Sequence, residues 1–175
     1  MRVRKGVVAA ATFVCVLLLS GCGGGAASAS ATATPKATAT PSVPHAGQSA
    51  DQIVAGLKSK GLPIGDVFTY TAANDPNNLL GRPGQYLSKD NFKDTRISST
   101  DTGADISVSD GGAIETFTSS TDAQKRFAYL QSISTSGNAL FAEYEYLDGD
   151  AILRISSQLT PDQAQAYATA FKALS

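Results

Sequence analysis

Residues 140–156 read LFAEYEYLDGDAILRIS, and this stretch decides the fold. Two runs rich in aromatic, aliphatic and β-branched residues flank Asp148-Gly149, a dipeptide that favours a two-residue type I′ turn. The sequence therefore predicts a tight antiparallel hairpin.

This turn also predicts which side chains share a face of the sheet. It places Tyr144 opposite Leu153 on the core side, and Glu143 opposite Arg154 on the other side. We expect the Glu143 and Glu145 face to be a solvated row of charges, because one face of an antiparallel sheet is commonly exposed.

Helix signals surround the hairpin. Thr160-Pro161-Asp162-Gln163 combines an N-cap, an N1 proline and an N3 glutamine, and so predicts a C-terminal helix. Ser49 and Gln52 form a second capping box, and Gly61 and Leu62 match a Schellman motif. Further elements are expected as a helix over 49–60, strands over 67–71, 92–97 and 113–117, and a helix from Ser119 or Ser120 to about Gly137.

This order predicts one globular α+β domain over residues 49–175. Its antiparallel sheet has about five strands, with helices packed on one face.

The N-terminus carries a targeting signal. Basic residues precede an apolar run over 7–19, which is shorter than the about 20 residues that a membrane helix needs. Leu19-Ser20-Gly21-Cys22 follows and resembles the bacterial lipobox. The resemblance implies a signal peptide over 1–21 and a diacylglyceryl group on Cys22, with an N-acyl chain as a further option. The alternative is an ordinary cleaved signal whose cysteine is incidental.

Two or more acyl chains would hold the mature protein stably on the outer face of the cytoplasmic membrane. Residues 22–48 are mostly Gly, Ala, Ser, Thr and Pro, and we expect a disordered tether. The only histidine, His45, falls in this tether, so we do not expect it to bind a metal or act as a base.

Composition excludes several classes of function. Of 175 residues, 14 are Lys or Arg and 15 are Asp or Glu, and the leader removes part of the basic set, so nucleic acid is not an expected partner. Cys15 leaves with the leader and Cys22 is the lipid site, which leaves the domain without a cysteine thiolate. We expect no catalytic residues, no metal and no cofactor.

The longest irregular stretch is expected to be functional. Residues 74–86 are dense in turn formers, and Gly81 and Gly84 would let a ligand's phosphate or carboxylate approach the backbone. The alternative is a structural turn in which Tyr86 closes over the core and Arg82 meets an aspartate. The predicted contact set is Asp75, Asn77, Arg82, Gln85, Tyr86 and Arg96.

The segment from Asn74 to Arg96, with Leu80-Gly81-Arg82-Pro83-Gly84-Gln85-Tyr86 and Asp94-Thr95-Arg96, resembles a family of uncharacterised actinomycete lipoproteins. The resemblance implies a tethered extracytoplasmic domain and supplies no activity.

The function predicted is a non-catalytic binding or interaction module of unknown ligand, with a wall component or a membrane protein as partner. A carboxylate-based wall hydrolase using Glu115, Glu143 and Glu145 is one alternative. A prophage-type exclusion lipoprotein is another. Calcium at Asp101, Asp105 and Asp110, or at Asp148-Gly149-Asp150, lacks EF-hand spacing and is disfavoured.

Overall fold

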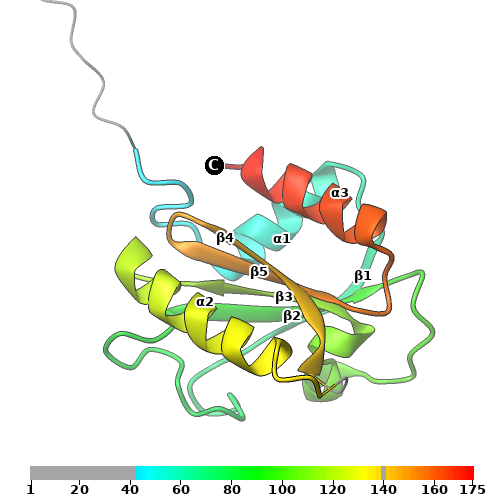
Figure 1. Ribbon diagram of the computed structural model, residues 1–175, viewed down its shortest axis with the longest axis horizontal. Coiled ribbons are helices and arrows are strands. Elements are labelled where there is room, and N and C mark those ends of the chain that lie inside the picture. Colours follow the sequence, from blue (N-terminus) through cyan, green and yellow to red (C-terminus); the bar gives the residue numbers. More distant parts are fainter. Residues whose placement is uncertain (1–41, 139–140) are drawn as a thin grey trace, which may run out of the picture. The chain divides into compact units, whose positions relative to one another are not determined.

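The computed structural model describes residues 42–138 and 141–175. Within these ranges an antiparallel sheet is combined with three α-helices (Figure 1). The elements are α1 (Ala50–Ser59), β1 (Ile64–Thr69), β2 (Ser88–Asp94), η1 (Gly103–Asp105), η2 (Val108–Asp110), β3 (Gly111–Thr116), α2 (Ser120–Ser134), β4 (Glu143–Asp148), β5 (Ala151–Ser156) and α3 (Pro161–Lys172).

The sheet has five strands in the order β1-β2-β3-β5-β4, and every neighbouring pair is antiparallel. The predicted α+β class and five-stranded antiparallel sheet are therefore confirmed. None of the described helices is both long and apolar enough to cross a membrane.

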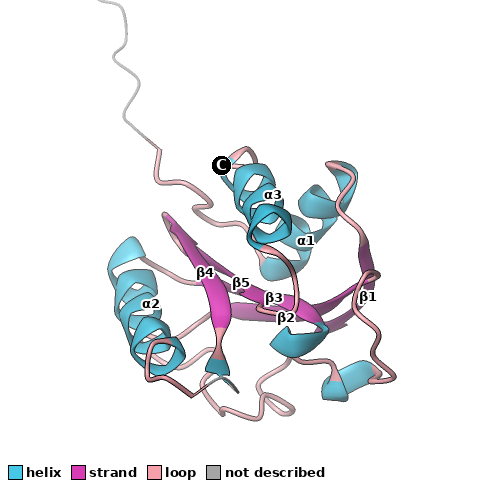
Figure 2. Cartoon of the chain, turned by 45° about the vertical axis from the view of Figure 1, so that its right-hand side comes forward, coloured by secondary structure: helices cyan, strands magenta, loops and turns pink. Residues whose placement is uncertain are grey.

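The helices do not share one face of the sheet, as we had expected. Ile114 and Leu153 face a core made with α1 and α3, whereas Ile152 faces a second cluster with Ala123 and Leu130 of α2. Figure 2 shows α1 and α3 on one side of the sheet and α2 on the other. The expectation was wrong because α2 covers the face that we took to be solvated.

The helix caps formed as predicted. Both capping boxes are present, with Ser49 and Gln52 at α1 and with Thr160 and Gln163 at α3. After α1, Gly61 has a φ of 83°, and the Leu62 amide donates to the Leu57 carbonyl at 3.4 Å, which is the Schellman pattern.

The hairpin formed, but its turn lies one residue further along the chain. Asp148 pairs with Ala151, so Gly149 and Asp150 are the central residues, and Tyr144 faces Ile155 rather than Leu153. Of these two central residues only Gly149 has a positive φ, which excludes a type I′ turn.

Tertiary contacts account for this turn. The Asp150 amide donates to Pro44 at 3.1 Å and its carbonyl accepts from Phe117 at 2.8 Å, so both backbone groups of Asp150 are used by other segments. The observed partner of each β4 residue lies two positions further along β5 than predicted, and because side chains alternate with a period of two, each side chain keeps its predicted face.

Residues 42–48, which we name the strap, belong to the domain rather than to a disordered tether. His45 is only 3% exposed and stacks on Phe171 with ring centroids 4.3 Å apart. Its Nδ1 lies 2.6 Å from Gln48, and its Nε2 lies 3.4 Å from the Asp148 carboxylate. Aromatic stacking and the turn of the hairpin therefore hold a segment whose composition alone suggested disorder. The remaining tether residues and Cys22 lie outside the described residues.

The polar residues Lys89, Asp90 and Asn91 are buried in β2, a strand that we placed too late, at 92–97. Asp90 is fully buried on the side of α1, and neither of its oxygens has a hydrogen-bond partner of good geometry. Burial raises the pKa of the Asp90 carboxyl to about 6, and the Thr69 hydroxyl offsets this only in part. Ionised Asp90 is therefore a destabilising element of the core.

We predict that Asp90→Asn stabilises the domain at pH 8 and not at pH 4. The pKa of Asp90 is higher in the folded protein than in the unfolded chain, so its proton stabilises the folded state fully at pH values below the unfolded pKa. That stabilisation is lost as the pH rises through the folded pKa of about 6. The gain at pH 8 should be about 1–3 kcal/mol in the free energy of unfolding, measured by urea titration. Asp66→Asn, on the exposed side of β1, is the control. An equal gain at both pH values would contradict the assignment.

Candidate functional site

A groove of about 1300 Å³ lies on the α2 side of the sheet, and we name it the outer groove. Its floor is formed by side chains of β2 and β5, among them Lys89, Asn91 and Arg154. The C-terminal half of α2 forms one wall. The central loop, residues 74–87, and the segment 104–109 form the others.

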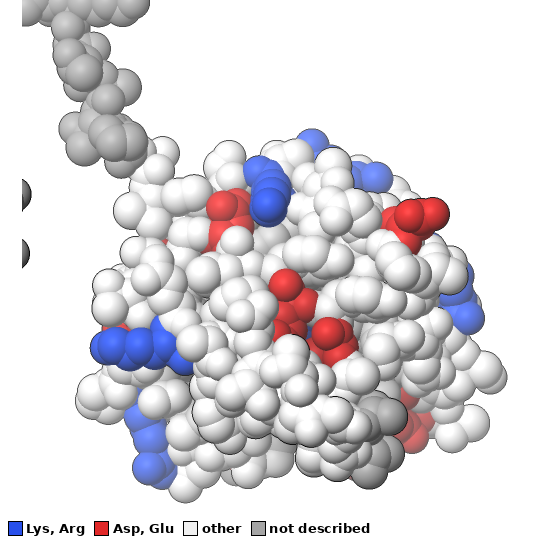
Figure 3. All heavy atoms as spheres, in the orientation of Figure 1, with Lys and Arg blue, Asp and Glu red and all other residues white. Residues whose placement is uncertain are grey.

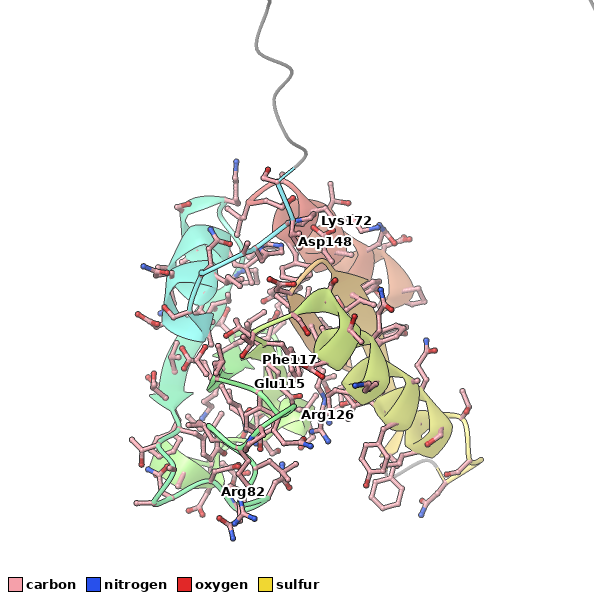
Figure 4. All side chains as sticks on the ribbon, turned by 90° about the vertical axis from the view of Figure 1, so that its left-hand side faces the viewer. Arg82, Glu115, Phe117, Arg126, Asp148 and Lys172 are labelled. Atoms are coloured by element: carbon pink, nitrogen blue, oxygen red, sulfur yellow. The ribbon has the colours of Figure 1, made fainter. Side chains whose placement is uncertain are left out.

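The floor is organised by a fully buried carboxylate. Glu115 of β3 accepts two hydrogen bonds from the Arg126 guanidinium, at 2.8 and 2.9 Å, and one from Arg154 at 3.2 Å. Arg154 also donates twice to Glu143, at 2.9 Å each. We name Glu115, Arg126, Arg154 and Glu143 the charge cluster. Figure 4 shows Glu115 and Arg126 side by side between the sheet and α2.

Two guanidinium groups hold Glu115 in its ionised form. Burial alone would raise the pKa of Glu115, but the hydrogen bonds and charges of Arg126 and Arg154 outweigh burial and lower it. Guanidinium groups that donate in pairs suit such a buried carboxylate. The predicted register that puts Glu143 directly opposite Arg154 is wrong, because Arg154 pairs with Glu145 and Glu143 with Ser156. Glu143 and Arg154 still form an ion pair, diagonal across the hairpin.

Glu145 lies next to the charge cluster and behaves differently. Burial, followed by its hydrogen bond with Glu143, raises the pKa of the Glu145 carboxyl to about 7. Glu143, which lies two residues before Glu145 on β4, already accepts two hydrogen bonds from Arg154. The two carboxyl groups of a glycosidase are both available to the substrate across a space of about 5 to 9 Å, whereas Glu143 is engaged in an ion pair.

Lys89 is a buried cation at the edge of the groove. Its ammonium lies 3.5 Å from Asp75 and 4.3 Å from the centroid of the Tyr70 ring. Burial lowers the pKa of Lys89 although Glu115 and Asp75 oppose this. Its side chain is 5% exposed, and its charge is matched by the carboxylate beside it.

Three members of the predicted contact set come together inside the central loop. The Tyr86 hydroxyl donates to Asp75 at 2.6 Å, and Asn77 donates to the Tyr86 oxygen at 3.3 Å. Asp75 also accepts from the backbone amides of Leu79 and Leu80, at 2.8 and 3.1 Å. Tyr86 is fully buried, so it closes over the core as the alternative of a structural turn predicted, rather than facing a ligand.

These bonds set the charge of Asp75. Burial would raise its pKa, but hydrogen bonds from Tyr86 and from the two amides outweigh burial and lower it. Asp75 thus serves as the anchor around which the central loop folds.

The other predicted residues do not join this group. Arg82 is exposed at the tip of the central loop and points away from the domain (Figure 4). Gln85 is half-buried and lines the outer groove. Arg96 lies beyond the opposite end of β2, where it donates twice to Asp94 at 2.8 and 2.6 Å. Asp94 also accepts from Tyr167 of α3, so Arg96 belongs to a structural ion pair on the α3 side.

Four residues that line the groove were not predicted as site residues: Lys89, Asn91, Arg126 and Arg154. Ser88–Asn91 is a run of polar residues that falls between the predicted loop over 74–86 and the predicted strand over 92–97, and it was assigned to neither. Arg126 lies on a helix that the sequence predicts, but only the position of α2 against the sheet turns its guanidinium inward to Glu115.

Figure 3 shows acidic side chains gathered near the middle of the viewed face, with most Lys and Arg toward its margins. Among the described residues, no three His, Cys, Asp or Glu side chains are placed to hold a metal ion together.

The chain matches no protein-family model, no curated protein and no solved structure.

We predict that Glu115→Gln destabilises the domain by about 3–5 kcal/mol, because it leaves the buried Arg126 and Arg154 without their shared counter-charge. Urea unfolding at pH 7 measures the loss. Lys125→Gln removes only the exposed pair with Asp122 and should barely move the midpoint. A similar small change for Glu115→Gln would show that the charge cluster does not support the fold.

A second prediction concerns the central loop. Tyr86→Phe removes the hydroxyl that donates to Asp75 and should cost about 1–2 kcal/mol in the free energy of unfolding. The amides of Leu79 and Leu80 should also exchange faster with solvent, because their acceptor loses its support. Tyr144→Phe, on the other face of the sheet, is the control. Unchanged exchange at both amides in Tyr86→Phe would refute the anchor role of Asp75.

Proposed function

We propose that this protein is a lipid-anchored extracytoplasmic binding module that takes a cell-envelope ligand into the outer groove without catalysis. The observation that carries the proposal is a groove of about 1300 Å³ whose floor is lined by charged groups that are already paired with one another. Binding sites are commonly preformed concave surfaces with a few fixed polar groups.

The same geometry disfavours the hydrolase alternative. Glu115 is occupied by Arg126 and Arg154, and Glu143 is occupied by Arg154. Glu145 has a raised pKa of about 7, the value that suits a general acid, but its neighbour Glu143 on β4 is paired with Arg154. A second carboxylate placed to act as a separate nucleophile or base is not among the groups of the charge cluster.

The anchor belongs to the same proposal and is supported by the sequence Leu19-Ser20-Gly21-Cys22. The likeness of residues 74–96 to actinomycete lipoproteins agrees with this location. The prophage-type exclusion role would use the same anchored layout, and no contact in the described residues favours it.

We predict that the protein from the membrane fraction of an actinomycete host has an intact mass that begins at an acylated Cys22. Cys22→Ala should be shed or remain unprocessed, because a single peptide chain without acyl groups has no stable hold on the bilayer. Mass spectrometry of both fractions measures this. A wild-type chain that is secreted without modification would contradict the anchor.

The binding role is tested by sedimentation with isolated cell envelopes. The full chain in detergent should co-sediment with envelopes and release no soluble sugar or peptide from them. Glu145→Gln should sediment like the wild type, since no catalytic step is proposed for this residue. Release of fragments that Glu145→Gln abolishes would support the hydrolase instead.

A further inference from the structure

We infer that the outer groove binds a segment of a neutral oligosaccharide chain, an inference that rests on the proposed function and names its ligand class. Four features of the groove point to this class: its charge balance, an unused buried acceptor, exposed aromatic rings and its size.

The charges on the floor cancel one another. Each cation on the floor contacts a carboxylate within 3.5 Å, in the pairs Lys89–Asp75, Arg126–Glu115 and Arg154–Glu143. An anionic or cationic ligand would have to separate one of these buried pairs, and that separation is costly. A neutral ligand with hydroxyl groups can instead bond to the outer atoms of the pairs while they stay intact.

The floor also holds a buried acceptor with spare capacity. Asn91 is 5% exposed, and its amide nitrogen donates to the Ile106 carbonyl at 2.7 Å and to the Tyr70 oxygen at 3.0 Å. The Asn91 side-chain oxygen accepts from no protein donor. Buried acceptors are normally satisfied, and this oxygen exposes less than 1 Å² of surface, so a ligand O–H donor reaches it once a covering side chain of the groove moves aside.

Two aromatic rings stand at the mouth of the groove. Tyr129 is 56% exposed and Phe141 is 52% exposed, and both line the groove. The Arg126 guanidinium lies 5.6 Å from the centroid of the Tyr129 ring and supports it from the side of the floor. An exposed flat ring beside polar groups can pack against the apolar C–H face of a sugar while sugar hydroxyls reach the floor.

The size of the groove favours a chain of linked units over a single small molecule. Pockets for small molecules have volumes of about 300–1,000 Å³, and the outer groove has about 1300 Å³.

Calorimetry on the full chain in detergent tests the inference. The probes are neutral hexasaccharides of glucose, mannose, galactose, arabinose and N-acetylglucosamine, with hexagalacturonate and an uncharged octapeptide as competing classes. We expect at least one neutral hexasaccharide to bind. Tyr129→Ala should weaken its binding by about tenfold or more, and Tyr129→Phe, which keeps the ring, should stay within about threefold.

Arg82→Ala is the matched control, because Arg82 is exposed on the central loop and does not line the groove. Thermal melting of each variant separates weakened binding from unfolding. Hexasaccharide binding that Tyr129→Ala leaves unchanged would overturn the site.

Binding of only hexagalacturonate or the octapeptide would overturn the ligand class, and so would binding of no probe. The envelope sedimentation separates these outcomes. Sedimentation that depends on Tyr129, with no hexasaccharide bound, would retain the proposed function and reject the oligosaccharide. If no hexasaccharide binds and the protein does not sediment with envelopes, both the oligosaccharide ligand and the proposed binding function are rejected.

Discussion

The ionised carboxylate of Glu115 sits in the interior between the sheet and α2, and it is stable there because two guanidinium groups donate to it. Taking such a charge out of water is costly unless its partners are close and well oriented. Arg126 comes from α2 and Arg154 from β5, so one carboxylate fixes the position of a helix and a strand relative to β3. Arg154 in turn reaches Glu143 of β4. The face that α2 covers is therefore held by polar contacts as much as by its small apolar cluster, and its charged groups are paired before any ligand arrives.

Features encoded by near neighbours were predictable from the sequence. The capping residues Ser49 and Thr160 and the Schellman glycine Gly61 act within one helical turn, and each was assigned correctly. The hairpin was found, but its turn was misplaced, because the Pro44 carbonyl that fixes Asp150 is remote in sequence. The prediction of the sheet face against which α2 packs was wrong for the same reason. The apolar stripe of α2 is weak, and the contact of its Arg126 with Glu115 is possible only once the sheet has formed.

The candidate site divides in the same way. The central loop was correctly singled out by its turn residues, and Asp75, Asn77 and Tyr86 do meet there. Their role is internal support, which composition could not separate from ligand contact. Lys89 and Asn91 carry the polar floor, and they were overlooked because polar residues inside a strand resemble a loop when read alone. Arg96 was grouped by closeness along the chain, while the length of β2 places it at the other end of the strand.

The strap gives the domain a definite mechanical connection on its N-terminal side. Pro44 is bonded to the hairpin turn, and a Cβ at Gly149 would collide with its carbonyl, so the two backbones are in close contact. His45 is stacked on Phe171 of α3. A force applied to the chain ahead of residue 42 therefore meets the β4–β5 turn and α3 together before it reaches α1. It must shear a stacked ring pair and a backbone hydrogen bond, and it does not peel the first helix from the sheet one contact at a time. Arg82 at the tip of the central loop lies at the far end of the domain from Asp148 of this turn (Figure 4), so the central loop takes no direct part in the attachment.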